Sequence, residues 1–155
     1  MDTSTFINSA SAHCEQNGAK LTDLRRQVLD LVLQHDGVVK AYQILSDLQQ
    51  TRASAAPPTV YRALDFLVEQ GVLHRVDALN GYVVCQHLHD AQHHTQANLI
   101  MTCRDCGRVE EMVADAGVQA LRASCLAQGF EMDNQQLLLN GRCVQCVQCV
   151  DKDVH

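Results

Sequence analysis

PPTVYRALDFLVEQGVLHRVDALNGYVVC, residues 57–85, is the stretch that decides the fold of the N-terminal half. The proline pair at its start fixes the φ angles that open a helix, and Gly71 ends that helix. Two apolar runs then flank Asn80 and Gly81, a dipeptide typical of a two-residue hairpin turn. The stretch therefore predicts a helix followed directly by a β-hairpin.

The predicted helix has an apolar face and a polar face. Its polar face carries Thr59, Tyr61 and Arg62 in the first two turns. Arg62 can reach a phosphate or the acceptor edge of guanine, and Tyr61 can donate to a phosphate or pack on a base methyl. These residues are candidates for reading DNA, although an ordinary solvated helix face has a similar composition. The buried stripe is expected to comprise Val60, Ala63, Leu64, Leu67 and Val68.

Two further helices are predicted before this stretch. Thr22 can cap the first of them, and the second spans Lys40–Gln50. Their apolar residues recur at helical spacing, so each helix is expected to turn one stripe inward. The inward positions are Leu24, Val28, Leu31 and Val32 in the first helix, and Tyr42, Leu45 and Leu48 in the second.

Three helices and a hairpin form a winged helix, a module that binds DNA with its third helix in the major groove and its wing beside the backbone. Arg75, in the predicted hairpin, is then a candidate for phosphate contact. Lys40 and Tyr42, at the start of the second helix, are further DNA-contact candidates. The net charge of −6 excludes a broad basic coat but leaves room for a local basic face on one helix.

Two CxxC turns, Cys103-Arg-Asp-Cys106 and Cys143-Val-Gln-Cys146, provide four thiols at the spacing of a tetrahedral zinc site. Four thiolates leave no coordination position open for a substrate, so the site is interpreted as structural. A pair of redox motifs and a pair of disulfides are the alternatives. Cys149 repeats the spacing once more and is either a spare thiol or an exchange partner for Cys143.

The remaining composition favours metal over disulfides. The N-terminus lacks the pattern of a signal peptide, and no apolar run approaches the roughly 20 residues of a membrane span. We therefore expect a cytoplasmic chain whose eight cysteines stay reduced. With only three phenylalanines and no tryptophan in 155 residues, two small metal-assisted domains are as plausible as one ordinary domain. Cys14 and Cys125 fall in helical patterns and are interpreted as core or surface thiols.

A second metal site is predicted in the hairpin. With a two-residue turn at Asn80 and Gly81, Cys85 lies opposite Val76 and diagonal to His74, with Cβ atoms about 7–8 Å apart or less. Taken singly, Cys85 is as typical of a small buried side chain, and His74 of an ordinary histidine. A thiolate among nitrogen and oxygen ligands would favour Zn²⁺ over Fe²⁺ or Mn²⁺.

PPTVYRALDFL, residues 57–67, and CRDCGRVEE, residues 103–111, resemble the ferric uptake regulator family, and within it the zinc uptake regulator branch. The resemblance spans about residues 15–147. It implies an α+β chain with an N-terminal winged helix-turn-helix DNA-binding domain (1–85), a hinge (86–97) and a small α/β dimerisation domain with the four-cysteine zinc site (98–155). The implied function is zinc-responsive repression of zinc uptake genes, by a homodimer bound to double-stranded operator DNA. An iron, nickel or peroxide sensor of the same family and a purely structural zinc protein are the alternatives.

The resemblance also implies which residues hold the second zinc, giving two zinc ions per monomer. The family's wing histidine, wing cysteine, hinge histidine and glutamate correspond to His74, Cys85, His94 and Glu111. His93 and His87 are substitutes for the hinge ligand, because the spacing from Cys85 favours His93, and His87 lies opposite His74 in the predicted hairpin register. The stretch between the hinge histidine and Cys103 is also about two residues longer than the family pattern. The His-rich loop can also be interpreted as a solvated linker that collects metal loosely.

The rest of the C-terminal half is expected to form a small sheet with one helix. Its predicted strands are Asn98–Thr102, Arg108–Val113 and Phe130–Leu139, and its helix is Ala116–Gln128. A sheet of few strands with exposed edges is stabilised by pairing with a second copy, which favours a two-fold dimer. No membrane partner and no small-molecule substrate are expected. An enzyme is disfavoured, because the PCxxC turn that a zinc deaminase combines with an HxE element is missing from the sequence: neither CxxC turn follows a proline.

Overall fold

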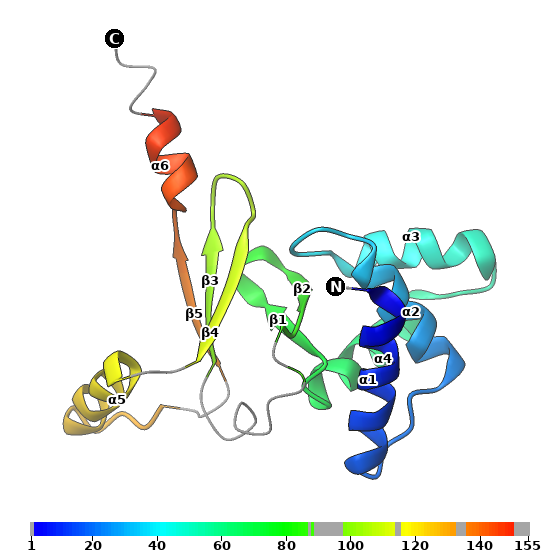
Figure 1. Cartoon of the computed structure of the whole chain (residues 1–155), viewed down its shortest axis with the longest axis horizontal. Coiled ribbons are helices and arrows are strands. Elements are labelled where there is room, and N and C mark those ends of the chain that lie inside the picture. Colours follow the sequence, from blue (N-terminus) through cyan, green and yellow to red (C-terminus); the bar gives the residue numbers. More distant parts are fainter. Residues whose placement is uncertain (1, 87, 89–97, 114–115, 133–135, 151–155) are drawn as a thin grey trace. The chain divides into compact units, whose positions relative to one another are not determined.

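The computed structural model describes residues 2–86, 88, 98–113, 116–132 and 136–150. They fall into two compact units, Met1–His89 and Asp90–His155, and each is described by itself. The first unit carries helices and a hairpin, and the second carries a small mixed sheet (Figure 1). Among the described residues, no helix is both long enough and apolar enough to cross a membrane.

The first unit is a winged helix preceded by one additional helix. Its last three helices and its hairpin follow the predicted order, and the last helix ends just before the predicted glycine, Gly71, which has φ +68°. The elements are α1 (Thr3–Gln16), α2 (Asp23–Leu33), α3 (Ala41–Thr51), α4 (Pro57–Glu69), β1 (Leu73–Val76), the 3₁₀ turn Asp77–Leu79 and β2 (Gly81–Val84).

Local sequence explains where these helices begin. The Thr22 hydroxyl accepts a hydrogen bond from the Arg25 amide at 3.5 Å and caps α2, as predicted. At α3, the Gln43 side chain accepts from the Lys40 amide at 2.9 Å. The proline pair occupies the first positions of α4, where a missing amide hydrogen costs no intrahelical bond.

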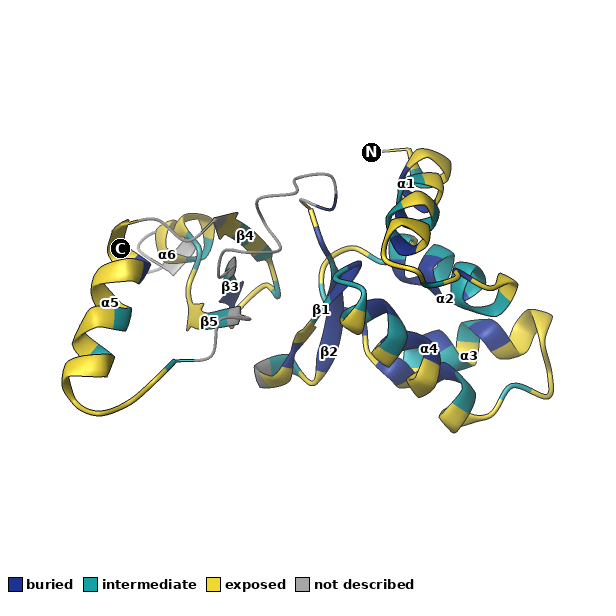
Figure 2. Cartoon of the chain, turned by 90° about the horizontal axis from the view of Figure 1, so that it is seen from below, coloured by how far each residue is buried: buried dark blue, intermediate teal, exposed yellow. Residues whose placement is uncertain are grey.

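The apolar stripe of α4 is buried in the core as predicted. Val60, Ala63, Leu64 and Leu67 are each no more than 2% exposed, and Val68 packs against them from the edge. Figure 2 shows the corresponding buried surfaces on the neighbouring helices of this unit. Each such aliphatic side chain contributes on the order of 1.5–3 kcal/mol when buried, so this stripe fixes how α4 sits on the unit.

Two predictions for the helices were wrong or incomplete. Tyr42 is 65% exposed, and Ala41 and Ile44 are buried in its place, so Tyr42 does not point inward. For the first helix, α1, the sequence analysis placed only Cys14 in a helical pattern and gave no bounds. Its buried face includes Phe6 and Cys14, and the His13 Nε2 atom lies 2.8 Å from the Gln70 carbonyl oxygen, which connects α1 to the end of α4.

The wing differs from the prediction in its turn. A 3₁₀ turn and Asn80, which has φ +48°, connect the strands, and Gly81 is the first residue of β2. The strands pair Leu73 with Val84 and His74 with Val83, a register shifted by four residues from the predicted one. The two-residue turn at Asn80 and Gly81 is therefore wrong, while the hairpin itself is confirmed.

Gly81 is required by a close approach of the chain from the start of α3. Val39 and Tyr82 exchange two backbone hydrogen bonds of 2.9 and 2.8 Å, which adds a short third segment to the wing. A Cβ atom on Gly81 would lie 2.8 Å from the Val39 carbonyl oxygen and would collide with the Val38 side chain. No larger residue fits here without moving the Val38–Val39 segment.

We expect Gly81→Ala to destabilise the chain by about 1–3 kcal/mol, the usual cost of overpacking. Chemical denaturation followed by circular dichroism measures the change. Gly141→Ala is the matched control, because a Cβ at that strand position meets nothing within 4 Å. Equal stability of the two variants would show that the Val38–Val39 segment yields at no cost.

The second unit contains a three-stranded sheet of order β4-β3-β5. Strand β3 runs antiparallel to β4 and parallel to β5. The predicted strand at Phe130–Leu139 is shorter than expected, since β5 starts at Gln136, and the helix after Cys143 was not predicted. The elements are β3 (Asn98–Cys103), β4 (Val109–Val113), α5 (Ala116–Ala127), β5 (Gln136–Gly141) and α6 (Val144–Val150).

The described part of the second unit exposes seven large apolar side chains. Helix α5 is largely exposed (Figure 2), and Val118 is the residue on it that is buried. A surface of this kind is unusual on a small monomeric unit and typical of an association surface. Its exposed members are Met112, Leu121, Leu126, Phe130, Leu139, Val144 and Val147, which we call the apolar surface of the second unit.

Candidate metal and DNA-binding sites

The two CxxC turns lie at the same end of the sheet of the second unit. Cys103 ends β3, and the turn that follows is closed by the Cys103 amide donating to the Arg108 carbonyl at 2.8 Å. Gly107, with φ +73°, allows the chain to reverse there. Because β3 and β5 are parallel, Cys103 pairs with Gly141, and the second CxxC turn begins two residues later.

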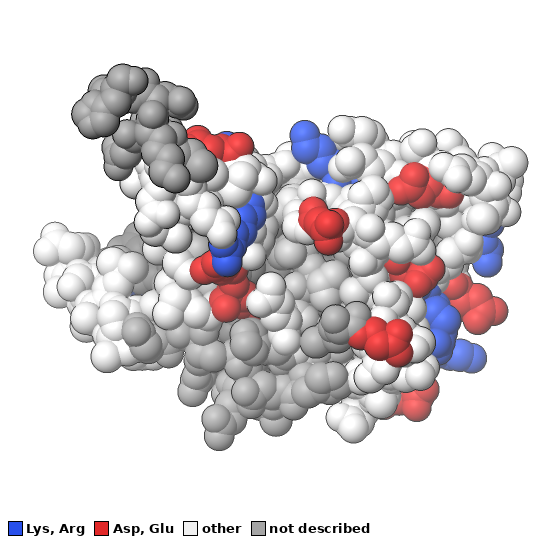
Figure 3. Space-filling view, turned by 45° about the horizontal axis from the view of Figure 1, so that its top comes forward, with Lys and Arg blue, Asp and Glu red and all other residues white. Residues whose placement is uncertain are grey.

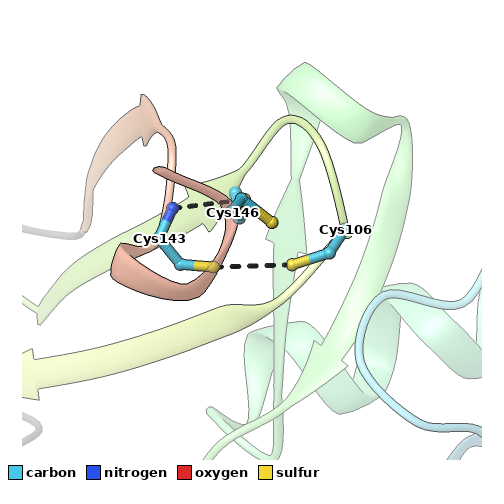
Figure 4. Close-up of side chains that lie close together, drawn as sticks. Cys106, Cys143 and Cys146 are labelled. Atoms are coloured by element: carbon cyan, nitrogen blue, oxygen red, sulfur yellow. Dashed lines mark hydrogen bonds between the residues drawn. The ribbon is translucent and has the colours of Figure 1, made fainter. Parts of the chain in front are cut away.

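Helix α6 places the second pair of thiols. Cys143 immediately precedes α6, and its carbonyl accepts from the Val147 amide at 3.0 Å. Cys146 therefore lies in the first turn of the helix, on the same side as Cys143. Figure 4 shows Cys143 and Cys146 on this turn facing Cys106 on the other.

The four sulfurs fit a tetrahedral zinc ion. All lie within 4.8 Å of one another, and the Cys106 and Cys143 sulfurs are 3.7 Å apart. Zinc–sulfur bonds of about 2.3 Å give a tetrahedron with edges of about 3.8 Å, whereas a disulfide requires about 2.05 Å. None of the seven cysteines whose side chains are described forms a disulfide. The geometry favours the predicted zinc site over the disulfide alternative.

Hydrogen bonds prepare one of these thiols for metal binding. The Cys143 amide donates to the Cys103 sulfur at 3.3 Å and, with the Cys106 amide, lowers the pKa of Cys103 to about 6. Hydrogen bonds with Cys143 and Cys106 raise the pKa of Cys146. Without metal, Cys103 therefore loses its proton more readily than Cys146 does. A cation is needed to hold all four sulfurs as thiolates.

An ion pair connects the two turns independently of metal. Arg142 Nε donates to Asp105 Oδ2 at 2.5 Å, and an Arg142 guanidinium nitrogen lies 3.3 Å from the Cys146 carbonyl oxygen. This pair was not predicted. Opposite charges within or beside the two CxxC motifs were the signal in the sequence that could have indicated it.

The wing brings together the two ligand candidates of the first unit. The ligand atoms of His74 and Cys85 lie within 4.8 Å of each other. Cys85 is 3% exposed and its amide donates to the Val72 carbonyl at 3.0 Å, which continues the hairpin beyond β2. In the observed register His74 pairs with Val83, so Cys85 is still diagonal to His74 on the same face.

That face of the wing points away from the helical core. On the opposite face, Leu73 and Tyr82 belong to the core cluster and Val84 packs against it, while His74, Val83 and Cys85 do neither. The wing therefore presents a thiol and an imidazole side by side, outside the core of its own unit.

The other predicted ligands are less well defined. Glu111 lies on β4, paired with Ile100 in the second unit, and is half-buried. His87, His93 and His94 lie outside the described residues. The prediction that His87 is opposite His74 is nevertheless wrong, because Val83 occupies that position.

The DNA-contact candidates are mostly at the surface. Tyr61 is 49% exposed and Arg62 is exposed on α4, while Thr59 is half-buried. Lys40 and Tyr42 are exposed at the start of α3. Acidic and basic side chains are interspersed on the face shown in Figure 3, so this face carries no broad basic coat.

Arg75 has a partner that the sequence analysis did not identify. Its Nε atom donates to Asp77 Oδ1 at 2.9 Å, and both side chains are more than half exposed. The candidate phosphate contact in the wing is therefore already engaged with a carboxylate.

Comparisons with known proteins agree with this architecture. The model of the ferric uptake regulator family matches residues 16–140. The zinc uptake regulation protein of Escherichia coli is 38% identical over 146 residues, which are 94% of this chain and 84% of that protein. The solved structure of a zinc uptake regulator complexed with zinc and DNA matches with a TM-score of 0.84 and 33% identity, over 97% of this chain and 99% of the other. The crystal structure of holo XcZur matches with a TM-score of 0.77 and 34% identity, over 93% and 98%.

Proposed function

This chain belongs to the ferric uptake regulator family, and from that premise we propose that it is a zinc-responsive transcriptional repressor. It binds double-stranded operator DNA as a homodimer when its regulatory zinc site is filled, and it controls genes of zinc uptake. The name of the Escherichia coli relative and the zinc-and-DNA complex of a zinc uptake regulator support this proposal. Acting on chromosomal DNA, it works in the cytoplasm.

One observation carries the zinc response: His74 and Cys85 lie within 4.8 Å of each other on the wing of a DNA-binding unit. The four-cysteine cluster can hold one structural zinc. The thiol of Cys85 and the imidazole of His74 are separate from that cluster, so they can hold a second zinc. A buried thiol beside an imidazole is a donor set that favours zinc over harder divalent ions. We therefore assign two zinc ions to each monomer.

Glu111 and His94 complete the regulatory site in this proposal, with His93 and His87 as substitutes for His94. Residues 1–85 then form the DNA-binding domain, 86–97 the hinge and 98–155 the dimerisation domain. When bound, zinc supplies a single point at which side chains from the wing, the hinge and the second unit are held together. Those side chains can converge only in one relative orientation of the units, and that orientation is the one that binds DNA.

DNA recognition is assigned to the exposed start of α4. Arg62 and Tyr61 read base edges and phosphates from the major groove, and Thr59 supports them. Lys40, Tyr42 and Arg75 contact the backbone on either side. In a dimer, two copies of α4 must be separated by about 34 Å or a multiple to enter successive major grooves.

Dimerisation is assigned to the apolar surface of the second unit. Phe130, Leu126 and Leu139 are each more than half exposed in a single chain. Edge strands and exposed apolar side chains are both covered when a second copy packs on this unit about a two-fold axis.

Among the alternatives, a sensor for iron, nickel or peroxide from the same family is disfavoured by the thiol of Cys85. A purely structural zinc protein would leave the exposed polar face of α4 without a purpose. Both alternatives make distinct predictions for metal content and for the metal that activates DNA binding.

The test is DNA binding by the purified full-length protein across buffered concentrations of free zinc. The DNA is selected from a random-sequence pool by the zinc-loaded protein, and zinc per chain is counted in parallel. We expect about two zinc ions per chain and DNA binding that strengthens 5–150-fold or more as the second site fills. One tight zinc without a DNA response supports the structural alternative. Activation by Fe²⁺ at equal free-metal concentration supports a sibling sensor.

A further inference from the structure

The tip of the wing carries an ion pair that bears on how this chain selects DNA. Arg75, the last but one residue of β1, donates from Nε to Oδ1 of Asp77, the first residue of the 3₁₀ turn, at 2.9 Å. Their side chains are 54% and 75% exposed. The pair therefore lies in solvent at the point of the wing that a winged helix brings beside the DNA backbone.

Charge is scarce in this wing. Between Val72 and Cys85 the sequence contains one arginine, Arg75, no lysine, and one acidic residue, Asp77. The pair thus cancels the formal charge of the segment, with His74 taken as neutral. On a chain of net charge −6, each arginine at the DNA surface matters, because contacts of Lys and Arg with phosphate supply the sequence-independent attraction.

The geometry points to Asp77 as a specificity-determining residue, and we propose that it suppresses sequence-independent binding by the wing. This inference rests on the proposed function. Phosphate contacts attract any DNA, whereas base contacts by α4 distinguish one sequence from another. By pairing with Arg75, Asp77 weakens the phosphate contact of the wing, which adds equally to the affinity for every DNA sequence. The base contacts of Arg62 and Tyr61 are left unchanged.

An exposed ion pair is weak enough for this role. A phosphate that is held in register by α4 can displace the carboxylate from Arg75, because exposed pairs of this kind contribute little to stability. A phosphate on unrelated DNA, without that register, meets an arginine that is already paired and a carboxylate that repels it. Asp77 therefore raises the ratio of specific to non-specific affinity instead of blocking binding.

Asp77→Asn tests the inference without altering side-chain shape or the backbone bond from the Asn80 amide to the Asp77 carbonyl. Affinities of the zinc-loaded, full-length protein are measured over a salt series, for selected DNA and for unrelated DNA of equal length. We expect binding to unrelated DNA to tighten about two- to fivefold and its salt dependence to steepen by about one ion. The selected-to-unrelated affinity ratio should fall.

Two controls separate this effect from a change of net charge. Glu15→Gln removes one exposed negative charge from α1 and should leave the affinity ratio unchanged. In Arg75→Gln, adding Asp77→Asn should have no further effect on unrelated DNA, since the cation that Asp77 engages is gone. An unchanged ratio in Asp77→Asn, or a gain that persists in the double variant, overturns the role of Asp77. A native protein that fails to distinguish the two DNAs with zinc bound overturns the proposed function instead.

Discussion

Replacing Cys106 by alanine is expected to unfold the second unit and to abolish dimer formation. The loss follows from how little of that unit is otherwise buried. In its described part, the buried apolar side chains are Ile100, Cys103 and Val118. Structural zinc sites of this kind contribute on the order of 10–16 kcal/mol, which exceeds the total stability of most small domains. Without Cys106, three thiols leave one of the four positions of the structural zinc without a protein ligand.

Circular dichroism, size-exclusion chromatography and zinc counting on the purified variant measure this effect. Cys125→Ala is the matched control, because Cys125 is a half-buried thiol on α5 that lies outside the cluster. Treating the native protein with a strong zinc chelator should reproduce the defect of the Cys106 variant. A variant that stays folded and dimeric with full zinc content would contradict a structural role for this thiol.

Features decided by local stereochemistry were predictable from the sequence. The prolines before Thr59 and the φ preference of Gly71 fix both ends of α4, and its buried stripe follows from the helical repeat. The CxxC spacing likewise determines which sulfurs can meet, whatever elements carry them. The bounds of helix α1 were not predicted, because small and polar residues, including Ala10 and Cys14, dilute its apolar repeat.

The wing shows where local signals are insufficient. Gly81 resembles a turn glycine in sequence, but the structure needs it as a strand residue because Val39, far earlier in the chain, approaches it closely. Only the tertiary contact reveals that requirement. The diagonal relation of His74 and Cys85 survived the wrong turn because a shift of four residues preserves the alternation of faces. An odd shift would have placed the two candidate ligands on opposite faces.

Solvent-facing positions were the hardest to predict. Tyr42 fits the apolar repeat of α3 and was expected inside, yet its ring is largely exposed. An aromatic ring with a hydroxyl is compatible with either environment, so periodicity alone does not decide between core and DNA contact. The pairing of Arg75 with Asp77 was missed as well, because the sequence predicted a two-residue turn at Asn80 and Gly81 and gave no sign of the 3₁₀ turn that begins at Asp77.

Cys85→Ala is expected to leave the protein folded and dimeric while abolishing its response to zinc. The substitution removes one ligand from the wing pair, so zinc content should fall from about two ions per chain to about one. DNA binding in excess zinc should then equal that of the native protein with the regulatory site empty, a loss of about 5–150-fold per site. His74→Ala should give the same result, since each residue is one half of the pair.

Cys14→Ala is the control that makes this result specific. Cys14 is a thiol in the same unit that is as deeply buried as Cys85, at 0% and 3% exposure. Its loss costs packing in the core, but it lies on α1 and takes no part in the described metal-ligand clusters. We therefore expect Cys14→Ala to lower thermal stability and to keep the zinc response, whereas Cys85→Ala does the reverse. Zinc-dependent DNA binding that survives in Cys85→Ala would remove the wing from the sensing mechanism and leave the second zinc to other ligands.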